Sequence, residues 1–134
     1  MVGKVRSRGS EQLARPGGPA NASLEEVQAN LGRTGYPADK LIFVKGLLEQ
    51  TARDASSIDK LALVRLGTDW HASTKAALEH LYPRLVSGGV LIVDDYGHHK
   101  GQQLAVHEYF ASSAEPPTLL NRIDYSCRLG VSGE

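Results

Sequence analysis

The sequence predicts one α/β domain with a mainly parallel sheet that helices cover on both faces. Short segments of unbroken apolar residues alternate with amphipathic helical segments along the chain. This alternation is typical of parallel sheets, whose strands are buried on both sides. The length of 134 residues fits a single domain with a real hydrophobic core. No helix separates the two final strands, so we expect that pair to be antiparallel.

The elements follow from local patterns. Ser23 and Glu26 form a capping-box pattern that begins a helix, and this helix continues with apolar residues at helical spacing, namely Leu24, Val27 and Leu31. Continuous apolar runs predict strands at 41–44, 61–66, 88–95, 118–123 and 128–132. The segment 46–54 is expected to be at most a brief helix or a turn, and helical periodicity predicts further helices at 71–85 and 100–112. On the last of these, the expected buried side chains are Val106, Tyr109 and Phe110.

The composition disfavours nucleic-acid-binding, membrane and secreted proteins. Fifteen basic and fifteen acidic side chains cancel, so the net charge does not favour a nucleic-acid or membrane partner. Cys127 is the single cysteine, and the sequence has neither a membrane-spanning apolar run nor a hydrophobic signal core. We therefore expect a cytoplasmic protein. Residues 1–21 lack apolar periodicity and predict a disordered tail, which leaves 22–134 as the domain.

Three carboxylates follow two of the predicted strands. Asp69 comes shortly after the strand at 61–66, and Asp94 and Asp95 end the strand at 88–95. Ligands of open α/β sheets bind beyond the carboxyl ends of the strands, and oxygen donors suit Mg²⁺. The structural alternatives stay open: Asp69 caps the following helix, and the Asp pair merely starts a loop.

The segment from Leu61 to Phe110 resembles the macrocin O-methyltransferase family of S-adenosylmethionine-dependent enzymes, which methylate sugar hydroxyls of macrolides, aminocoumarins and other glycosides. The shared motifs are "YPRL", a Gly-Gly pair before a strand, and "DDYGH", and they occur in the family's order. The likeness covers about residues 22–132. It implies a Rossmann-like methyltransferase fold, an O-methyltransferase activity and a small-molecule glycoside acceptor.

The resemblance also implies site residues. The family has an Asp-x-Asp after the strand at 61–66, and its first Asp, a metal ligand and candidate base, falls on Gly67 here. Asp94 and Asp95 would complete the Mg²⁺ site with one ligand lost, unless a backbone shift at Gly67 brings Asp69 inward. His98 and His99 follow the Asp pair and are candidates to contact a metal or an acceptor. His98 matches "DDYGH", so we assign acceptor-side catalysis to His98 and Asp69.

The cofactor site is incomplete by the same comparison. Lys45 and Gly46 resemble the part of the pocket near the adenine of S-adenosylmethionine. The glycine-rich turn after the family's first strand and the acidic residue after its second have no counterpart, so the fold is expected to be partial and to lack the first βαβ unit. We therefore expect weak or absent S-adenosylmethionine binding and activity by this chain alone.

Two functional classes remain open, and a third is excluded. The first is the O-methyltransferase, and the second is a non-catalytic domain that binds a partner or a second copy. Strands 41–44 and 61–66 are apolar but lack the neighbours that the family provides, so we expect a homo-oligomer that buries Phe43 and Leu63. A phospho-receiver domain is excluded because too few residues follow Asp95.

Overall fold

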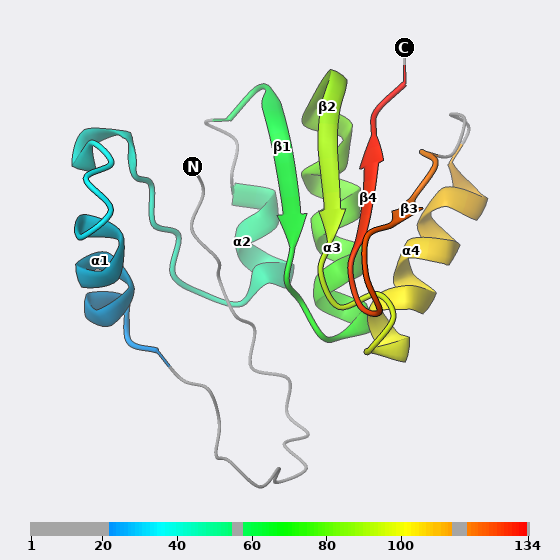
Figure 1. Cartoon of the computed structure of the whole chain (residues 1–134), viewed down its shortest axis with the longest axis horizontal. Coiled ribbons are helices and arrows are strands. Elements are labelled where there is room, and N and C mark those ends of the chain that lie inside the picture. Colours follow the sequence, from blue (N-terminus) through cyan, green and yellow to red (C-terminus); the bar gives the residue numbers. More distant parts are fainter. Residues whose placement is uncertain (1–21, 55–57, 114–117, 134) are drawn as a thin grey trace, which may run out of the picture.

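The structure is a computed structural model that describes residues 22–54, 58–113 and 118–133. Its sheet has four strands in the order β1-β2-β4-β3 (Figure 1). The strands are β1 (Leu61–Leu66), β2 (Leu85–Val93), β3 (Asn121–Arg122) and β4 (Arg128–Val131). The pair β1 and β2 is parallel, and β4 is antiparallel to both β2 and β3. The α/β class and the antiparallel final pair are thus confirmed, whereas the sheet is mixed rather than mainly parallel.

The predicted strand at 41–44 is wrong, because this segment forms no strand of the described sheet. Ile42 makes an isolated bridge and remains 49% exposed. The segment runs instead from a short 3₁₀ helix, Ala38–Lys40, to a bend at Gly46. A strand needs a neighbour to pair its backbone N–H and C=O groups, and the four-stranded sheet of the described residues ends at β1. An apolar run alone does not report whether that neighbour exists.

Four α-helices accompany the sheet in the described residues: α1 (Leu24–Gly32), α2 (Leu48–Asp54), α3 (His71–His80) and α4 (Lys100–Ser112). The capping box of α1 is confirmed, because the Ser23 Oγ accepts from the Glu26 N–H at 3.1 Å and the Glu26 carboxylate accepts from the Ser23 N–H at 2.8 Å. Helix α3 ends before the predicted residue 85. Pro83 follows it within a 3₁₀ helix, Tyr82–Arg84, because proline cannot donate a helical hydrogen bond.

The core lies between one face of the sheet and helices α2, α3 and α4 (Figure 1). Its fully or nearly fully buried side chains come from β1 and β2 and from α3 and α4, and they include Val64, Leu66, Leu91, Val93, Ala77, Leu78 and Val106. Tyr82 packs edge-on against Tyr109 and Phe110, with ring centroids 5.6 and 5.3 Å away. The predicted buried face of α4 therefore does contact the core.

The opposite face of the sheet is not covered by the described residues. Leu63 of β1 is 52% exposed and Val131 of β4 is 53% exposed. The strand register places Leu63 beside Val90, and Val90 beside Val131, so these three side chains form one row across the sheet. The expectation of strands buried on both faces is wrong for β1, because helices cover only one side of it in the described part of the chain.

Two further expectations concern the chain as a whole. The predicted disordered tail at 1–21 lies outside the described residues. Among the helices of the described ranges, none combines the length and the apolar character that crossing a membrane requires. The feature that matters for function is the end of the parallel pair: β1 and β2 finish side by side, and the Asp94 N–H donates to the Leu66 carbonyl at 2.9 Å.

Candidate functional site

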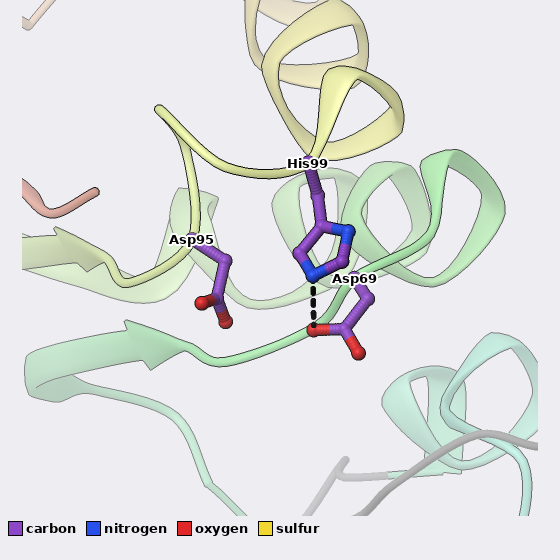
Figure 2. Close-up of side chains that lie close together, drawn as sticks. All are labelled: Asp69, Asp95 and His99. Carbon is purple, nitrogen blue, oxygen red and sulfur yellow. Dashed lines mark ion pairs between the residues drawn. The ribbon is translucent and has the colours of Figure 1, made fainter. Parts of the chain in front are cut away.

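Three side chains capable of holding a cation meet beyond the carboxyl ends of β1 and β2. They are Asp69, Asp95 and His99, and one donor atom of each lies within 4.8 Å of the others (Figure 2). The His99 Nε2 is 3.6 Å from the Asp69 Oδ1. All three residues are partly exposed, so a ligand from solvent can reach them. The predicted edge of the sheet is therefore where the structure gathers these donors.

Asp69 reaches this cluster because it does not cap helix α3. The N-cap residue is Trp70, and within the described residues it forms no side-chain capping hydrogen bond. The turn before the helix is fixed by a buried hydrogen bond of 2.7 Å between the Thr68 and Thr74 hydroxyls. The capping interpretation of Asp69 is thus wrong, and its carboxylate faces His99 instead.

Gln102 of α4 connects the two loops that carry the carboxylates. Its side chain is fully buried. The Gln102 Oε1 accepts from the Asp95 N–H at 2.9 Å, and its Nε2 donates to the Thr68 and Leu66 carbonyls at 2.6 and 3.3 Å. Buried amides of this kind must be satisfied to be stable. Gln102 therefore fixes the loop after β1 relative to the loop after β2.

Two glycines allow the close approaches that shape the site. A Cβ at Gly101 would lie 3.0 Å from the His71 backbone nitrogen, so a glycine lets the start of α4 pack against the start of α3. A Cβ at Gly97 would lie 2.0 Å from the Tyr125 carbonyl oxygen. Glycine at this second position lets the loop after β2 contact the β3–β4 hairpin. Both contacts hold the segment that carries Asp95 and His99.

The side chains of the adjacent residues Asp94 and Asp95 have different surroundings. The Asp94 Oδ2 forms an ion pair with the Arg65 Nη2 at 2.5 Å, and the Asp94 carbonyl accepts from the Ser126 Oγ at 2.8 Å. Asp94 is therefore held by β1 and by the β3–β4 hairpin. Asp95 lies in the cluster with Asp69. Of the two predicted metal ligands, the structure brings only Asp95 to the other donors.

The β3–β4 hairpin that supports Asp94 is organised by Asp124. Its Oδ1 accepts from the backbone N–H groups of Cys127 and Ser126, each at 2.7 Å. These hydrogen bonds, with Arg128 and Arg122 nearby, hold the pKa of the Asp124 carboxyl below its ordinary value. Asp124 therefore has a structural role in this turn.

The other predicted site residues lie around the cluster rather than in it. The exposed His98 has its Nδ1 3.4 Å from the Tyr125 hydroxyl and its ring 4.7 Å from that of His99. Gly67 contributes only backbone, between β1 and Thr68. Lys45 and Gly46 are both exposed and precede α2. Gly46 has φ 151°, and a Cβ there would lie 2.7 Å from the Thr51 methyl carbon, so only glycine suits that bend.

Sequence reasoning missed Gln102 and left His99 as one of two candidates to contact a metal or an acceptor. The motif match favours His98 for acceptor-side catalysis, and His99 is the one whose ring faces Asp69. The available signal was the His-His pair itself, together with the position of Gln102 three residues further on, one helical turn into α4. That spacing indicates that both residues lie on one side of the helix start, but it does not show which loop they face.

The comparisons with known proteins agree with this architecture. The family model described as macrocin-O-methyltransferase (TylF) matches residues 14–129. The chain is 42% identical over 86 residues to the 8-demethyl-8-(2,3-dimethoxy-alpha-L-rhamnosyl)-tetracenomycin-C 4'-O-methyltransferase of Streptomyces olivaceus, covering 64% of this chain and 32% of that protein. It is 39% identical over 87 residues to the mycinamicin III 3''-O-methyltransferase of Micromonospora griseorubida, covering 65% and 34%. The chain thus spans about a third of the length of these relatives.

Solved structures show the same relationship. The O-methyltransferase NovP superposes with a TM-score of 0.76 at 32% identity, covering 84% of this chain and 46% of that one. The apo TDP-rhamnose 3'-O-methyltransferase of calicheamicin biosynthesis superposes with a TM-score of 0.64 at 18% identity, covering 82% and 49%, and so supports the fold alone. The match to the family model extends over most of the sequence. This chain therefore belongs to the macrocin O-methyltransferase family.

Proposed function

We propose that this chain forms the cation- and acceptor-binding end of an S-adenosylmethionine-dependent O-methyltransferase that acts on a sugar hydroxyl of a glycoside. The observation that carries the proposal is the Asp69–Asp95–His99 cluster at the carboxyl ends of β1 and β2. One relative is named as a 4'-O-methyltransferase of a rhamnosyl-tetracenomycin C, and another as the mycinamicin III 3''-O-methyltransferase. The acceptor class is taken from those names.

The donor set of the cluster fits a divalent cation. Asp69 and Asp95 supply two carboxylates, which balance the charge of such an ion, and His99 supplies a neutral nitrogen. A bound cation lowers the pKa of a hydroxyl that contacts it. The partial exposure of the three donors leaves room for an acceptor hydroxyl beside them.

His98 is the proposed group for moving the acceptor proton. It lies on the same loop as Asp95 and His99, and its ring packs against that of His99. An imidazole nitrogen serves as a general base when it lies within reach of a hydroxyl. Asp69 is the second proposed catalytic group because its side chain is 44% exposed and lies 3.6 Å from His99.

The described residues fit S-adenosylmethionine only in part. Lys45 and Gly46 are the proposed contacts, and both are exposed on a segment without strand structure. When bound, this cofactor supplies the methyl group. Because two exposed residues can cover little of a cofactor's surface, we expect the chain alone to bind S-adenosylmethionine weakly.

A second candidate function is a non-catalytic domain that binds another copy of the chain. The row of apolar side chains formed by Leu63, Val90 and Val131 favours it, because Leu63 and Val131 are exposed on the sheet. Apolar side chains that meet on an open sheet face are typical of an interaction surface. In this alternative the Asp69–Asp95–His99 cluster has no catalytic role and binds no substrate.

The experiment that tests the proposed function measures acceptor binding separately from methyl transfer. Saturation-transfer difference NMR is recorded with a rhamnosyl glycoside, with and without a divalent cation. We expect signals from the sugar protons only when the cation is present, and their loss in Asp95→Asn. An Asp39→Asn variant serves as a matched control, since Asp39 lies in the 3₁₀ helix Ala38–Lys40. Glycoside binding that is the same with and without the cation, and the same in Asp95→Asn, would contradict the proposal.

A further inference from the structure

We propose that the Asp69–Asp95–His99 cluster selects a divalent transition-metal ion such as Zn²⁺ or Co²⁺ over Mg²⁺. The inference rests on the proposed function for its location at the acceptor end of the domain. It deepens that function because it makes the His99 nitrogen the group that decides which divalent ion the cluster prefers. It also departs from the Mg²⁺ that the family resemblance implies.

The geometry of the closest pair fits a shared ion. The His99 Nε2 and the Asp69 Oδ1 are 3.6 Å apart, which is longer than an ordinary hydrogen bond. Two donors at about 2.1 Å from a tetrahedral ion lie roughly 3.4 Å from each other. Asp95 has a carboxylate oxygen within 4.8 Å of both. Small side-chain rotations therefore place all three donors on one ion.

The donor types decide the selectivity. Mg²⁺ prefers six oxygen ligands in octahedral geometry and keeps several of its waters. An imidazole nitrogen suits Zn²⁺, Co²⁺, Ni²⁺ and Cu²⁺, for which affinity follows the Irving–Williams order. The cluster holds two carboxylates and one neutral nitrogen. A nitrogen donor in place of a third oxygen weakens the site for Mg²⁺ and favours the softer ions.

Neighbouring contacts distinguish His99 from the other imidazoles near the site. The His71 Nε2 is already paired with the Glu108 Oε2 at 2.6 Å, and the His107 Nε2 with the Tyr96 hydroxyl at 2.5 Å. The His98 Nδ1 faces the Tyr125 hydroxyl. His99 is the imidazole whose nitrogen faces a carboxylate of the cluster. The choice of ligand is therefore specific.

Support for Asp95 comes from the fully buried Gln102, which accepts from the Asp95 backbone N–H. The side chain of Gln102 is thus a positioning group for one carboxylate ligand. Arg65, the cation nearest to the adjacent aspartate, is neutralised by its ion pair with Asp94. Arg65 therefore does not compete with a metal ion for the carboxylates of Asp69 and Asp95.

The test is a metal titration of the purified chain without S-adenosylmethionine or acceptor. Isothermal titration measures Zn²⁺ and Mg²⁺ affinity, and the visible spectrum of the Co²⁺ form reports nitrogen coordination. We expect Zn²⁺ to bind at least ~10-fold more tightly than Mg²⁺. His99→Gln should lower Zn²⁺ and Co²⁺ affinity by at least ~10-fold and leave Mg²⁺ affinity nearly unchanged.

His99→Asp provides a variant whose expected effect is a gain. It restores a set of three carboxylates, so Mg²⁺ affinity should rise while Zn²⁺ affinity falls. His80→Gln, on the last turn of α3, controls for zinc binding to surface histidines, and circular dichroism confirms that each variant is folded. An equal affinity of the wild type for Mg²⁺ and Zn²⁺, or a zinc affinity that falls equally in His98→Gln, would overturn the inference while leaving the proposed function standing. Failure to bind any divalent cation would overturn both.

Discussion

Gln102 joins Asp95 to Thr68: its Oε1 accepts from the Asp95 N–H at 2.9 Å, and its Nε2 donates to the Thr68 carbonyl at 2.6 Å. These two partners lie on different loops, one after β2 and one after β1. A single buried side chain on α4 thus sets the separation of the two loops that carry Asp69 and Asp95. The candidate site depends on this residue although it offers no ligand atom itself.

Replacing Gln102 with methionine should destabilise the domain and weaken the cation site. Methionine has a similar volume but leaves the Thr68 and Leu66 carbonyls and the Asp95 N–H without their partner. The expected loss of unfolding free energy is ~2 kcal/mol, with a parallel loss of cation affinity. Urea denaturation and metal titration are the measurements.

Gln103→Met is the matched control for that variant. Gln103 neighbours Gln102 on α4 and is only half-buried, so its replacement should change the free energy of unfolding by less than ~0.5 kcal/mol. Equal stability of the two variants would show that the hydrogen bonds of Gln102 do not hold the loops together.

Placing an aspartate at position 67 should strengthen Mg²⁺ binding. Gly67 follows β1 directly and stands where the family resemblance puts a carboxylate ligand. Gly67→Asp adds one negative charge and one oxygen donor beside Asp69 and Asp95, so Mg²⁺ affinity should rise by about 10-fold or more. Isothermal titration with Mg²⁺ checks it. An unchanged affinity would mean that position 67 does not face the ion.

The open edge and face of β1 should mediate self-association. Leu63 is 52% exposed on β1, which is an edge strand of the described sheet. Exposed apolar edge strands favour pairing with another chain. Leu63→Lys should therefore shift the chain from dimer to monomer in sedimentation equilibrium at micromolar concentration. Leu119→Lys is a matched control, because Leu119 is 78% exposed and lies outside the four strands. A wild-type chain that stays monomeric at all concentrations would contradict this prediction.

Acid should loosen the β3–β4 hairpin below the ordinary pKa of an aspartate. The Asp124 carboxylate accepts two backbone hydrogen bonds, from Cys127 and Ser126, that lower its pKa from 3.8. Because the folded-state pKa is depressed, the stabilisation is present above the unfolded value and is lost as the pH falls through the folded value. The Cys127 and Ser126 amide proton shifts should titrate with a midpoint below 3.8. A midpoint at or above 3.8 would show that these hydrogen bonds do not stabilise the Asp124 carboxylate in the folded hairpin.

Local features of the fold were predictable, whereas features that depend on distant partners were not. The capping box of Ser23 and Glu26 lies within one helical turn, so the sequence contains all of its determinants. The strand at 41–44 was predicted from an apolar run, but a strand forms only if a neighbour pairs with it. The same limit explains why β1 was expected to be buried on both faces.

In the candidate site, too, local features were predictable and features that depend on distant residues were not. The edge of the sheet was predicted from the positions of Asp69 and Asp95 after strands. The choice between Asp94 and Asp95 depends on Arg65, which is 29 residues from Asp94 in the sequence and binds it in the structure. Gln102 acts through contacts 34 and 36 residues away. Sequence spacing carries no information about such contacts, so these roles became visible only in the folded chain.

The most direct test of the account is the anomalous scattering of a crystal of this chain grown with Co²⁺ or Zn²⁺. We predict one strong peak about 2.0–2.2 Å from the Asp69 and Asp95 carboxylate oxygens and the His99 Nε2. Asp94 should remain on Arg65. A peak bound to Asp94 or His98 instead, or no peak near the carboxyl ends of β1 and β2, would contradict it.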